Sequence, residues 1–112
     1  MNKIPINPKP IIREAACIWE FTDEKTGELR KEKITVQYKG RSIAEIRAFQ
    51  TELNTRKEDD LVYLSETLVR RIFRLPEILG DEAVTLEFLE NQDTRNLGAM
   101  NEAISENENP KK

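Results

Sequence analysis

The sequence predicts a small α+β domain, in which an N-terminal β-hairpin is followed by about four helices, so that the chain is mostly helical. Apolar residues first alternate with polar residues in two short stretches. From Ser42 onward, apolar residues instead recur with helical spacing. Turn and cap residues separate these segments. The 112 residues fit one such domain.

Composition limits the classes of function. Hydrophobic residues make up 38% and charged residues 35%, so the surface is large relative to the core. A net charge of -3 argues against a general nucleic-acid binder. The sequence contains no apolar run of the roughly 18 residues that span a membrane, and Met1 to Pro10 lacks the apolar centre of a secretory signal. We therefore expect a cytoplasmic protein without a membrane partner.

Residues for catalysis or metal binding are scarce. The chain has no histidine and one cysteine, Cys17, which excludes zinc sites of the usual Cys/His kinds and an intrachain disulfide. Without a histidine beside it, Cys17 is expected to be a small buried strand residue rather than a nucleophile. We expect no enzyme activity, no cofactor and no metal.

The ends of the chain differ from its middle. Residues 1–14 are predicted to form an extended arm, because Pro5, Pro8 and Pro10 suit neither a helix nor a central strand. The isoleucines of this arm are compatible with docking on the same domain or on a partner. Residues 15–106 form the predicted domain, and the polar residues 107–112 are predicted to be a flexible tail.

The predicted hairpin joins "ACIWEFT" to "KITVQYK" through "DEKTGE", in which Gly27 can take a positive φ. One of its faces presents Trp19, Phe21 and Val36. The aromatic side chains of Trp19 and Tyr38 are candidates for stacking on nucleic-acid bases. Core packing is favoured for both, because no basic residues are interleaved with them.

The next segment, "GRSIAEIRAFQTEL", predicts a helix. Ser42 followed by Glu45 forms a capping box, which marks the start of the helix. The apolar stripe of this helix contains Ile43, Ile46, Phe49 and Leu53, and its charged residues lie on the other side.

A longer helix is predicted from Glu58 or Asp59 to Leu75. The carboxylates of Glu58, Asp59 and Asp60 suit the positive end of the helix dipole better than a cation site. Arg70, Arg71 and Arg74 suit its negative end, and contact with phosphate is the alternative.

The apolar stripe of this longer helix is wide, since Val62, Val69 and Phe73 extend it. It is either core or, together with Phe88, Leu89 and Met100, a groove for a partner helix. The predicted partner-binding residues are Leu61, Leu64, Leu68 and Ile72.

Two short helices complete the prediction. Pro76 prevents the long helix from continuing, and Thr85 and Thr94 are the predicted N-caps of the helices that follow. Gly98 costs the last helix about 1 kcal/mol relative to alanine, which is compatible with a close helix contact at this position.

The order of these segments resembles a known family. "CIWEF" and "KITVQYKG" lead into "SIAEIRAFQTEL"; "RKEDD" then opens the helix that ends "RRIFRLPEILGDEAV", and "TLEFLENQDTRNLGAMNEAI" follows. Over about residues 15–106 this plan is similar to that of the tail assembly chaperones of long-tailed bacteriophages and prophages.

The resemblance implies a function. Such chaperones bind the long helical tape-measure protein in the host cytoplasm, keep it soluble and bring tail-tube subunits to it. They are not retained in the finished particle. The family often makes a longer product by ribosomal frameshifting, and two lysine codons at Lys111 and Lys112 would suit a slippery run.

Two other functions remain open. The first is a phage or prophage structural component of the tail or head-completion type, which forms oligomeric rings by sharing its hairpin between subunits. The second is a small nucleic-acid-binding regulator, which requires Arg41, Arg70, Arg71 and Arg74 to gather on one face.

Overall fold

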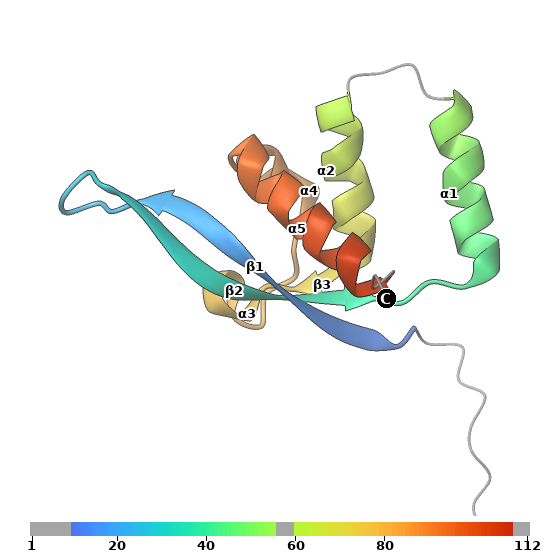
Figure 1. Ribbon diagram of the computed structural model, residues 1–112, viewed down its shortest axis with the longest axis horizontal. Coiled ribbons are helices and arrows are strands. Elements are labelled where there is room, and N and C mark those ends of the chain that lie inside the picture. The colour runs from blue at the N-terminus through green and yellow to red at the C-terminus, as the bar shows by residue number, and fades with distance from the viewer. Residues whose placement is uncertain (1–9, 56–59, 109–112) are drawn as a thin grey trace, which may run out of the picture.

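The computed structural model describes residues 10–55 and 60–108, with side chains in the second range from Leu64 onward. The fold is α+β, as predicted: a three-stranded antiparallel sheet in the order β1-β2-β3 is combined with five helices in these ranges. The hairpin projects beyond the helices at its turn, and α1 stands at the opposite end of the molecule (Figure 1). The prediction of about four helices missed only the short α3.

The hairpin is longer than predicted. Strand β1 (Ile12–Thr22) pairs with β2 (Leu29–Lys39) along all of its residues. Ile12 therefore belongs to the sheet and not to the predicted arm of residues 1–14. Gly27 has a φ of +74° in the turn, as the sequence predicts.

The buried face of the hairpin follows the predicted alternation. Ile34, Val36 and Tyr38 of β2 are buried on the same face as Ala15 and Trp19 of β1, and Val36 lies directly opposite Ala15. Phe21 has the same parity as Trp19 but is 38% exposed, because it lies next to the turn, opposite Arg30. The end of the hairpin therefore extends beyond the core.

The long predicted helix ends early. Helix α2 (Asp60–Arg71) is followed by strand β3 (Ile72–Arg74), which pairs with Gln37 and Tyr38 of β2. The prediction of helix up to Leu75 was wrong. Leu75 precedes Pro76, which disfavours helical backbone there, and the free edge of β2 offers hydrogen bonds to an extended segment.

Short helices follow β3. Helix α3 (Pro76–Leu79) begins at Pro76, and Glu77 accepts hydrogen bonds from the Thr35 N–H and hydroxyl at 2.8 and 2.9 Å. This carboxylate satisfies the edge of β2 just beyond β3. Helix α4 (Leu86–Glu90) has the predicted cap, since the Thr85 hydroxyl accepts from the Phe88 N–H at 3.1 Å.

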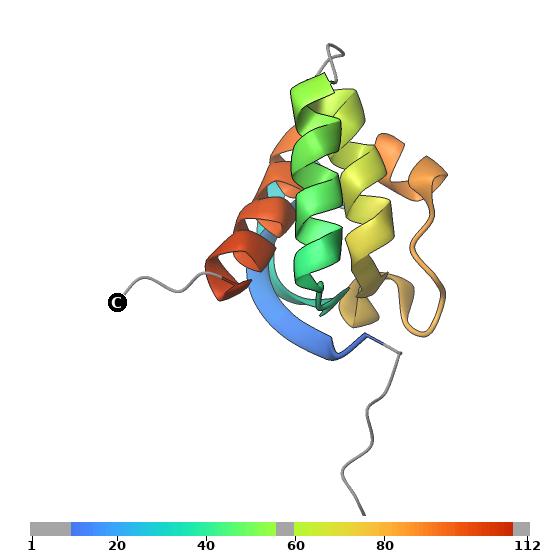
Figure 2. The same ribbon diagram turned by 90° about the vertical axis from the view of Figure 1, so that its right-hand side faces the viewer.

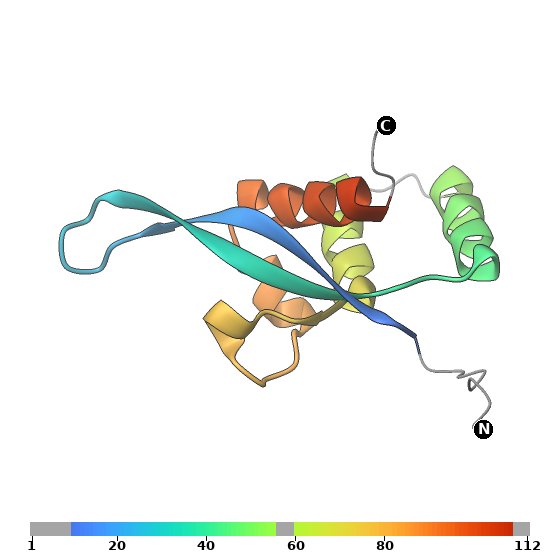
Figure 3. The same ribbon diagram turned by 60° about the horizontal axis from the view of Figure 1, so that its bottom comes forward.

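The last helix, α5 (Thr94–Glu108), covers one side of the hairpin, while α3 lies on the other side (Figure 3). Its cap is Asp93 rather than the predicted Thr94: the Asp93 carboxylate accepts from the Arg95 N–H at 2.8 Å. The helix includes Asn107 and Glu108, which were predicted to belong to a flexible tail. Both residues make long-range contacts, described below, that hold this end of the helix.

The core lies between the inner face of the hairpin, α2 and α5. Its largest fully buried side chains are Tyr38, Leu68, Leu75, Leu89, Met100 and Val36. Leu97 and Ile104 extend the face of α5 that enters this core, as their helical spacing predicts. A Cβ built on Gly98 would meet no atom of the described residues within 4 Å. The close helix contact that the sequence allows at Gly98 is therefore not present among these residues.

Candidate partner-binding groove

Helix α1 (Ile43–Thr55) carries an apolar stripe that the core does not cover. It contributes no buried residue, and Ile43, Ile46 and Leu53 are 71%, 37% and 45% exposed. The helix stands in front of α2 in Figure 2 and apart from it in Figure 1. The predicted helix is therefore confirmed, but its apolar side is open to a partner.

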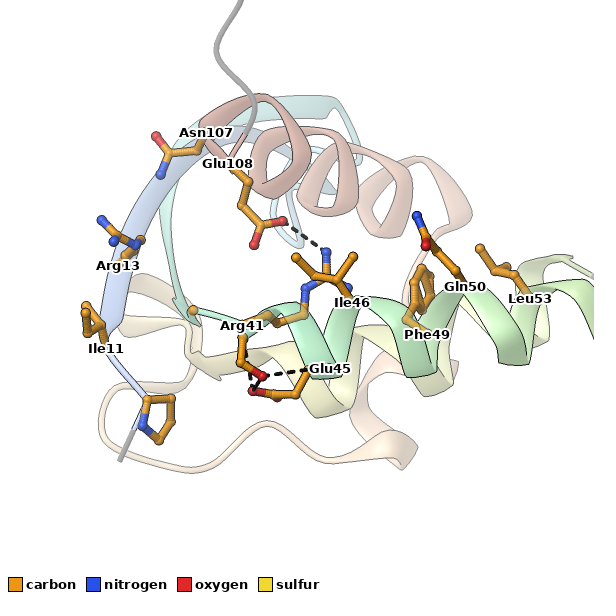
Figure 4. A pocket seen from close by; sticks show the side chains of 13 residues that line it. Ile11, Arg13, Arg41, Glu45, Ile46, Phe49, Gln50, Leu53, Asn107 and Glu108 are labelled. Atoms are coloured by element: carbon orange, nitrogen blue, oxygen red, sulfur yellow. Dashed lines mark hydrogen bonds and ion pairs between the residues drawn. The ribbon is translucent and has the colours of Figure 1, made fainter. Parts of the chain in front are cut away.

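This stripe forms one wall of a groove, which we call the α1 groove (Figure 4). The start of β1 and the end of α5 form the other walls, and the volume is about 1210 Å³. Ile46, Phe49 and Leu53 lie in a row along α1, with Ile11 and Arg13 across from them. The complete lining is Pro10, Ile11, Arg13, Gly40, Arg41, Ser42, Glu45, Ile46, Phe49, Gln50, Leu53, Asn107 and Glu108.

The start of α1 is fixed by the predicted capping box. The Ser42 hydroxyl accepts from the Glu45 N–H at 3.2 Å, and the Glu45 carboxylate accepts from the Ser42 N–H and hydroxyl, both at 3.1 Å. The hydrogen bond from the Ser42 N–H has the largest effect on the pKa of Glu45, followed by the bond from the Ser42 hydroxyl, and both lower this pKa below its usual value. The carboxylate therefore stays ionised at neutral pH at the mouth of the groove.

One acid joins two arginines at the end of the groove. The Glu108 carboxylate accepts from Arg71 at 2.6 Å and pairs with Arg41 at 3.3 Å. The side chains of Arg71, Arg41 and Glu108 are 11%, 19% and 19% exposed. Arg41 also lies over the Phe49 ring, 5.3 Å from its centre. This cluster ties the start of α1 to α2 and α5.

A second ion pair joins α1 to α2: Arg70 lies 3.1 Å from Glu52. Arg74 instead lies over the ring of its neighbour Phe73, 4.7 Å from the centre. Arg70, Arg71 and Arg74, for which phosphate contact was the alternative prediction, therefore point to different surroundings. Arg41 and Arg71 do come together, but around the carboxylate of Glu108. These four arginines therefore do not form the single basic face that a nucleic-acid-binding regulator requires.

Three of the four residues predicted to bind a partner pack in or against the core. Leu68 and Ile72 are 1% and 3% exposed within the core, and Leu64 is half-buried against it. Ile72 lies in β3 rather than on the helix. The side chain of Leu61 lies outside the described residues. Leu64, Leu68 and Ile72 therefore lack the exposure expected of a binding stripe, and partner binding through them stays a prediction.

The remaining candidates are structural where they are described. Trp19 and Tyr38 are buried, and the Tyr38 hydroxyl accepts from the Asn107 side-chain amide, so these rings are not free to stack on bases. Cys17 is half-buried on the inner side of β1; burial, and then the charge of Glu77, raises the pKa of its thiol. Phe88, Leu89 and Met100 pack in or against the core.

The acidic candidates fall at the boundary of the described residues. Glu58 and Asp59 lie outside the described residues, as does the side chain of Asp60. Among the side chains that are described, no group of three or more carboxylates or cysteines is arranged to hold a metal ion. No helix in the described ranges has the length and apolar character to cross a membrane.

The apolar residues of the groove were predicted from the sequence, but their exposure to solvent was not. Ile43, Ile46, Phe49 and Leu53 form the predicted stripe of α1. Periodicity gives the direction of an apolar face, and it does not tell whether the same chain covers that face. Comparison with protein-family models, curated proteins and solved structures finds no match for this chain.

Proposed function

We propose that this protein is a non-enzymatic assembly chaperone of phage tails, which binds a helical segment of the tape-measure protein in the α1 groove and helps recruit tail-tube subunits. The observation that supports the proposal most is the exposed stripe of Ile43, Ile46 and Leu53 on α1. A surface helix normally turns such a stripe toward its own core. The proposed site is the host cytoplasm, where tails are assembled.

The geometry suits an amphipathic helix. The 13 residues of α1 make a helix about 20 Å long, with apolar side chains at three- and four-residue steps. A partner helix lying along it can bury its own stripe against Ile46, Phe49 and Leu53. The charged side chains in the lining are two cations, Arg13 and Arg41, and two anions, Glu45 and Glu108, so the partner needs no net charge to balance them. This arrangement replaces the earlier expectation of binding through α2.

The first test is the DNA sequence that surrounds the gene. The proposal expects an A-rich slippery run near the lysine codons, an overlapping second frame and a very long helical reading frame downstream. A gene surrounded by unrelated metabolic or regulatory genes would remove the support that the resemblance gives.

The second test is binding of that long downstream product, produced together with this protein. Ile46→Glu and Leu53→Glu each place a charge in the α1 groove and are expected to abolish co-purification and leave the partner insoluble. Thr51→Glu is the matched control, because it adds the same charge at an exposed position of α1 that does not line the groove. Equal binding by Ile46→Glu and Thr51→Glu would contradict the proposed site.

A further inference from the structure

The free edge of β1 is the feature on which this inference rests. In an antiparallel pair, successive residues direct their backbone groups alternately toward the partner strand and away from it. The Ile11 carbonyl accepts from the Gly40 N–H at 2.8 Å on the β2 side. The backbone of Glu20 instead binds the Asn96 side chain on the outer side. Even-numbered residues of β1 therefore point their N–H and C=O groups outward.

The open part of this edge has defined ends. Ile12, Glu14, Ala16 and Ile18 point their backbone groups outward and are exposed. At Glu20 the edge closes, because the Asn96 amide bonds both the N–H and the C=O at 2.9 Å. At the other end, Pro10 has no N–H to donate. Seven residues with four outward pairs of backbone groups, which no other described residue hydrogen-bonds, remain available to another strand.

We propose that β1 pairs antiparallel with β1 of a second copy of this chain, with Ile12 opposite Ile18 and Ala15 on the two-fold axis. In this register the outward residues pair with each other: Ile12 with Ile18, and Glu14 with Ala16. Pro10 then falls opposite Glu20, so the ladder ends where Asn96 closes the edge. The two hairpins and their β3 strands become one continuous sheet.

The neighbouring registers are unfavourable. A shift of two residues in one direction places Glu14 directly opposite Glu14 of the second copy, where like charges repel. A shift in the other direction places Ile12 opposite Glu20, whose backbone is already bonded to Asn96. The proposed register avoids both problems and uses all four open residues.

The side chains also favour this partner. Ile12 and Ile18 are 41% and 51% exposed, and the two-fold axis brings them together twice. Pairs of β-branched residues across neighbouring strands stabilise a sheet. An isologous contact of this kind uses the edge on both copies and closes at two subunits, in contrast to a ring. The inference is independent of the function proposed above, since it concerns the purified chain alone.

A disulfide test reads the register directly. The pairing puts Arg13 of one copy opposite Cys17 of the other as a non-hydrogen-bonded pair, with about 4.5 Å between Cα atoms. This separation lies within the range for a disulfide, about 4.4–6.8 Å. Within one chain the two residues are four positions apart along a strand, about 13 Å, so they cannot join. Arg13→Cys is expected to form covalent dimers under mild oxidation.

Two controls accompany it. Arg13→Cys combined with Cys17→Ser should remain monomeric on a non-reducing gel. Ile11→Cys reports the register in which Glu14 lies opposite Glu14, because residue 11 then faces Cys17 of the second copy. This variant should cross-link poorly. Efficient cross-linking of Ile11→Cys, or none of Arg13→Cys, would overturn the proposed register.

Sedimentation equilibrium tests the pairing without cross-links. The unmodified chain is expected to shift from one-chain to two-chain mass as its concentration rises. Ala16→Pro removes an outward N–H that β2 does not use, and should weaken dimerisation about tenfold or more. Ile18→Lys should do the same through a charge at the edge, and it decides the outcome if Ala16→Pro does not fold. A chain that stays monomeric, or dimers unaffected by Ile18→Lys, would refute the proposal.

Discussion

The side-chain amide of Asn96 acts as a strand partner for Glu20: it accepts from the Glu20 N–H and donates to the Glu20 carbonyl, both at 2.9 Å. The two residues lie 76 positions apart in sequence. Asn96 is 3% exposed, so its amide has little access to water and depends on these bonds. This contact fixes the start of α5 on the edge of β1.

Replacing Asn96 therefore has a predictable cost. Asn96→Ala removes both bonds and leaves the Glu20 backbone groups partly buried, and we expect the free energy of unfolding to fall by about 2–3 kcal/mol. Urea denaturation measures the change. Asn101→Ala, at an exposed position of the same helix, controls for the helix itself and should change little. Equal effects at the two positions would show that the amide contact contributes nothing particular.

Leu68 and Ile46 provide a test of which apolar stripe belongs to the core. Leu68→Ala empties a position that is 1% exposed and should lower the free energy of unfolding by about 2–5 kcal/mol. Ile46→Ala changes a side chain that is 37% exposed and should cost less than about 1 kcal/mol. Thermal or urea unfolding of both variants compares them. The reverse order would mean that α1 packs on the core and α2 does not.

The parts of the fold that depend on neighbouring residues were predictable from sequence. Ser42 and Glu45 form their capping box within a few residues, and Thr85 caps α4 in the same way. Trp19 and Val36 reveal a buried face by simple alternation. In each case the physical cause lies inside the stretch that carries the pattern, so no knowledge of distant contacts is needed.

The parts of the fold that depend on distant residues were not predictable from sequence. Ile72 has helical spacing with Leu68, yet it joins β3 because β2 offers an open edge there. The stripe of α1 resembles a core stripe, but α2 makes its main contacts with α4 and α5, so the stripe of α1 stays uncovered. Deciding between such outcomes requires the positions of elements that are far apart in sequence.

Gly98 should be replaceable with a gain in stability. It lies inside α5 without a positive φ, and a Cβ there meets no atom of the described residues within 4 Å. Alanine restricts the unfolded chain and favours helix, so Gly98→Ala should raise the free energy of unfolding by about 0.5–1 kcal/mol. The midpoint of thermal unfolding reports the gain. A loss of stability would indicate that something occupies this space, as the sequence first indicated.

Glu77 should make stability depend on acid pH. Its hydrogen bond from the Thr35 backbone lowers its pKa, with a smaller contribution from the Thr35 hydroxyl. The stabilisation is therefore complete above the usual pKa of a glutamate and is lost as pH falls through the lowered value, below about pH 4. Denaturant midpoints between about pH 6 and pH 3 should fall less steeply for Glu77→Gln, which does not titrate.

Thr35→Val provides the comparison for this pH dependence. It removes the hydroxyl donor and keeps the backbone donor, so its slope should lie between those of the unchanged chain and Glu77→Gln. If the slopes of all three proteins coincide, Glu77 has the same pKa in the folded and unfolded chain, and the contact with Thr35 has no electrostatic effect.

The last test concerns Glu108, which sequence composition assigned to a flexible tail. Removing its carboxylate leaves Arg71 and Arg41 together without their shared acid, and Arg71 is 11% exposed at its side chain. Because a poorly solvated charge without its partner is unfavourable, Glu108→Ala should lower the free energy of unfolding by about 1–3 kcal/mol. Glu106→Ala, two residues earlier and exposed, is the matched control and should stay within about 0.5 kcal/mol. Hydrogen exchange should also become faster at the start of α1 in Glu108→Ala, because Arg41 loses its tie to α5. Equal stability and exchange in both variants would mean that the end of α5 is a solvated tail after all, and that the α1 groove has no fixed wall on that side.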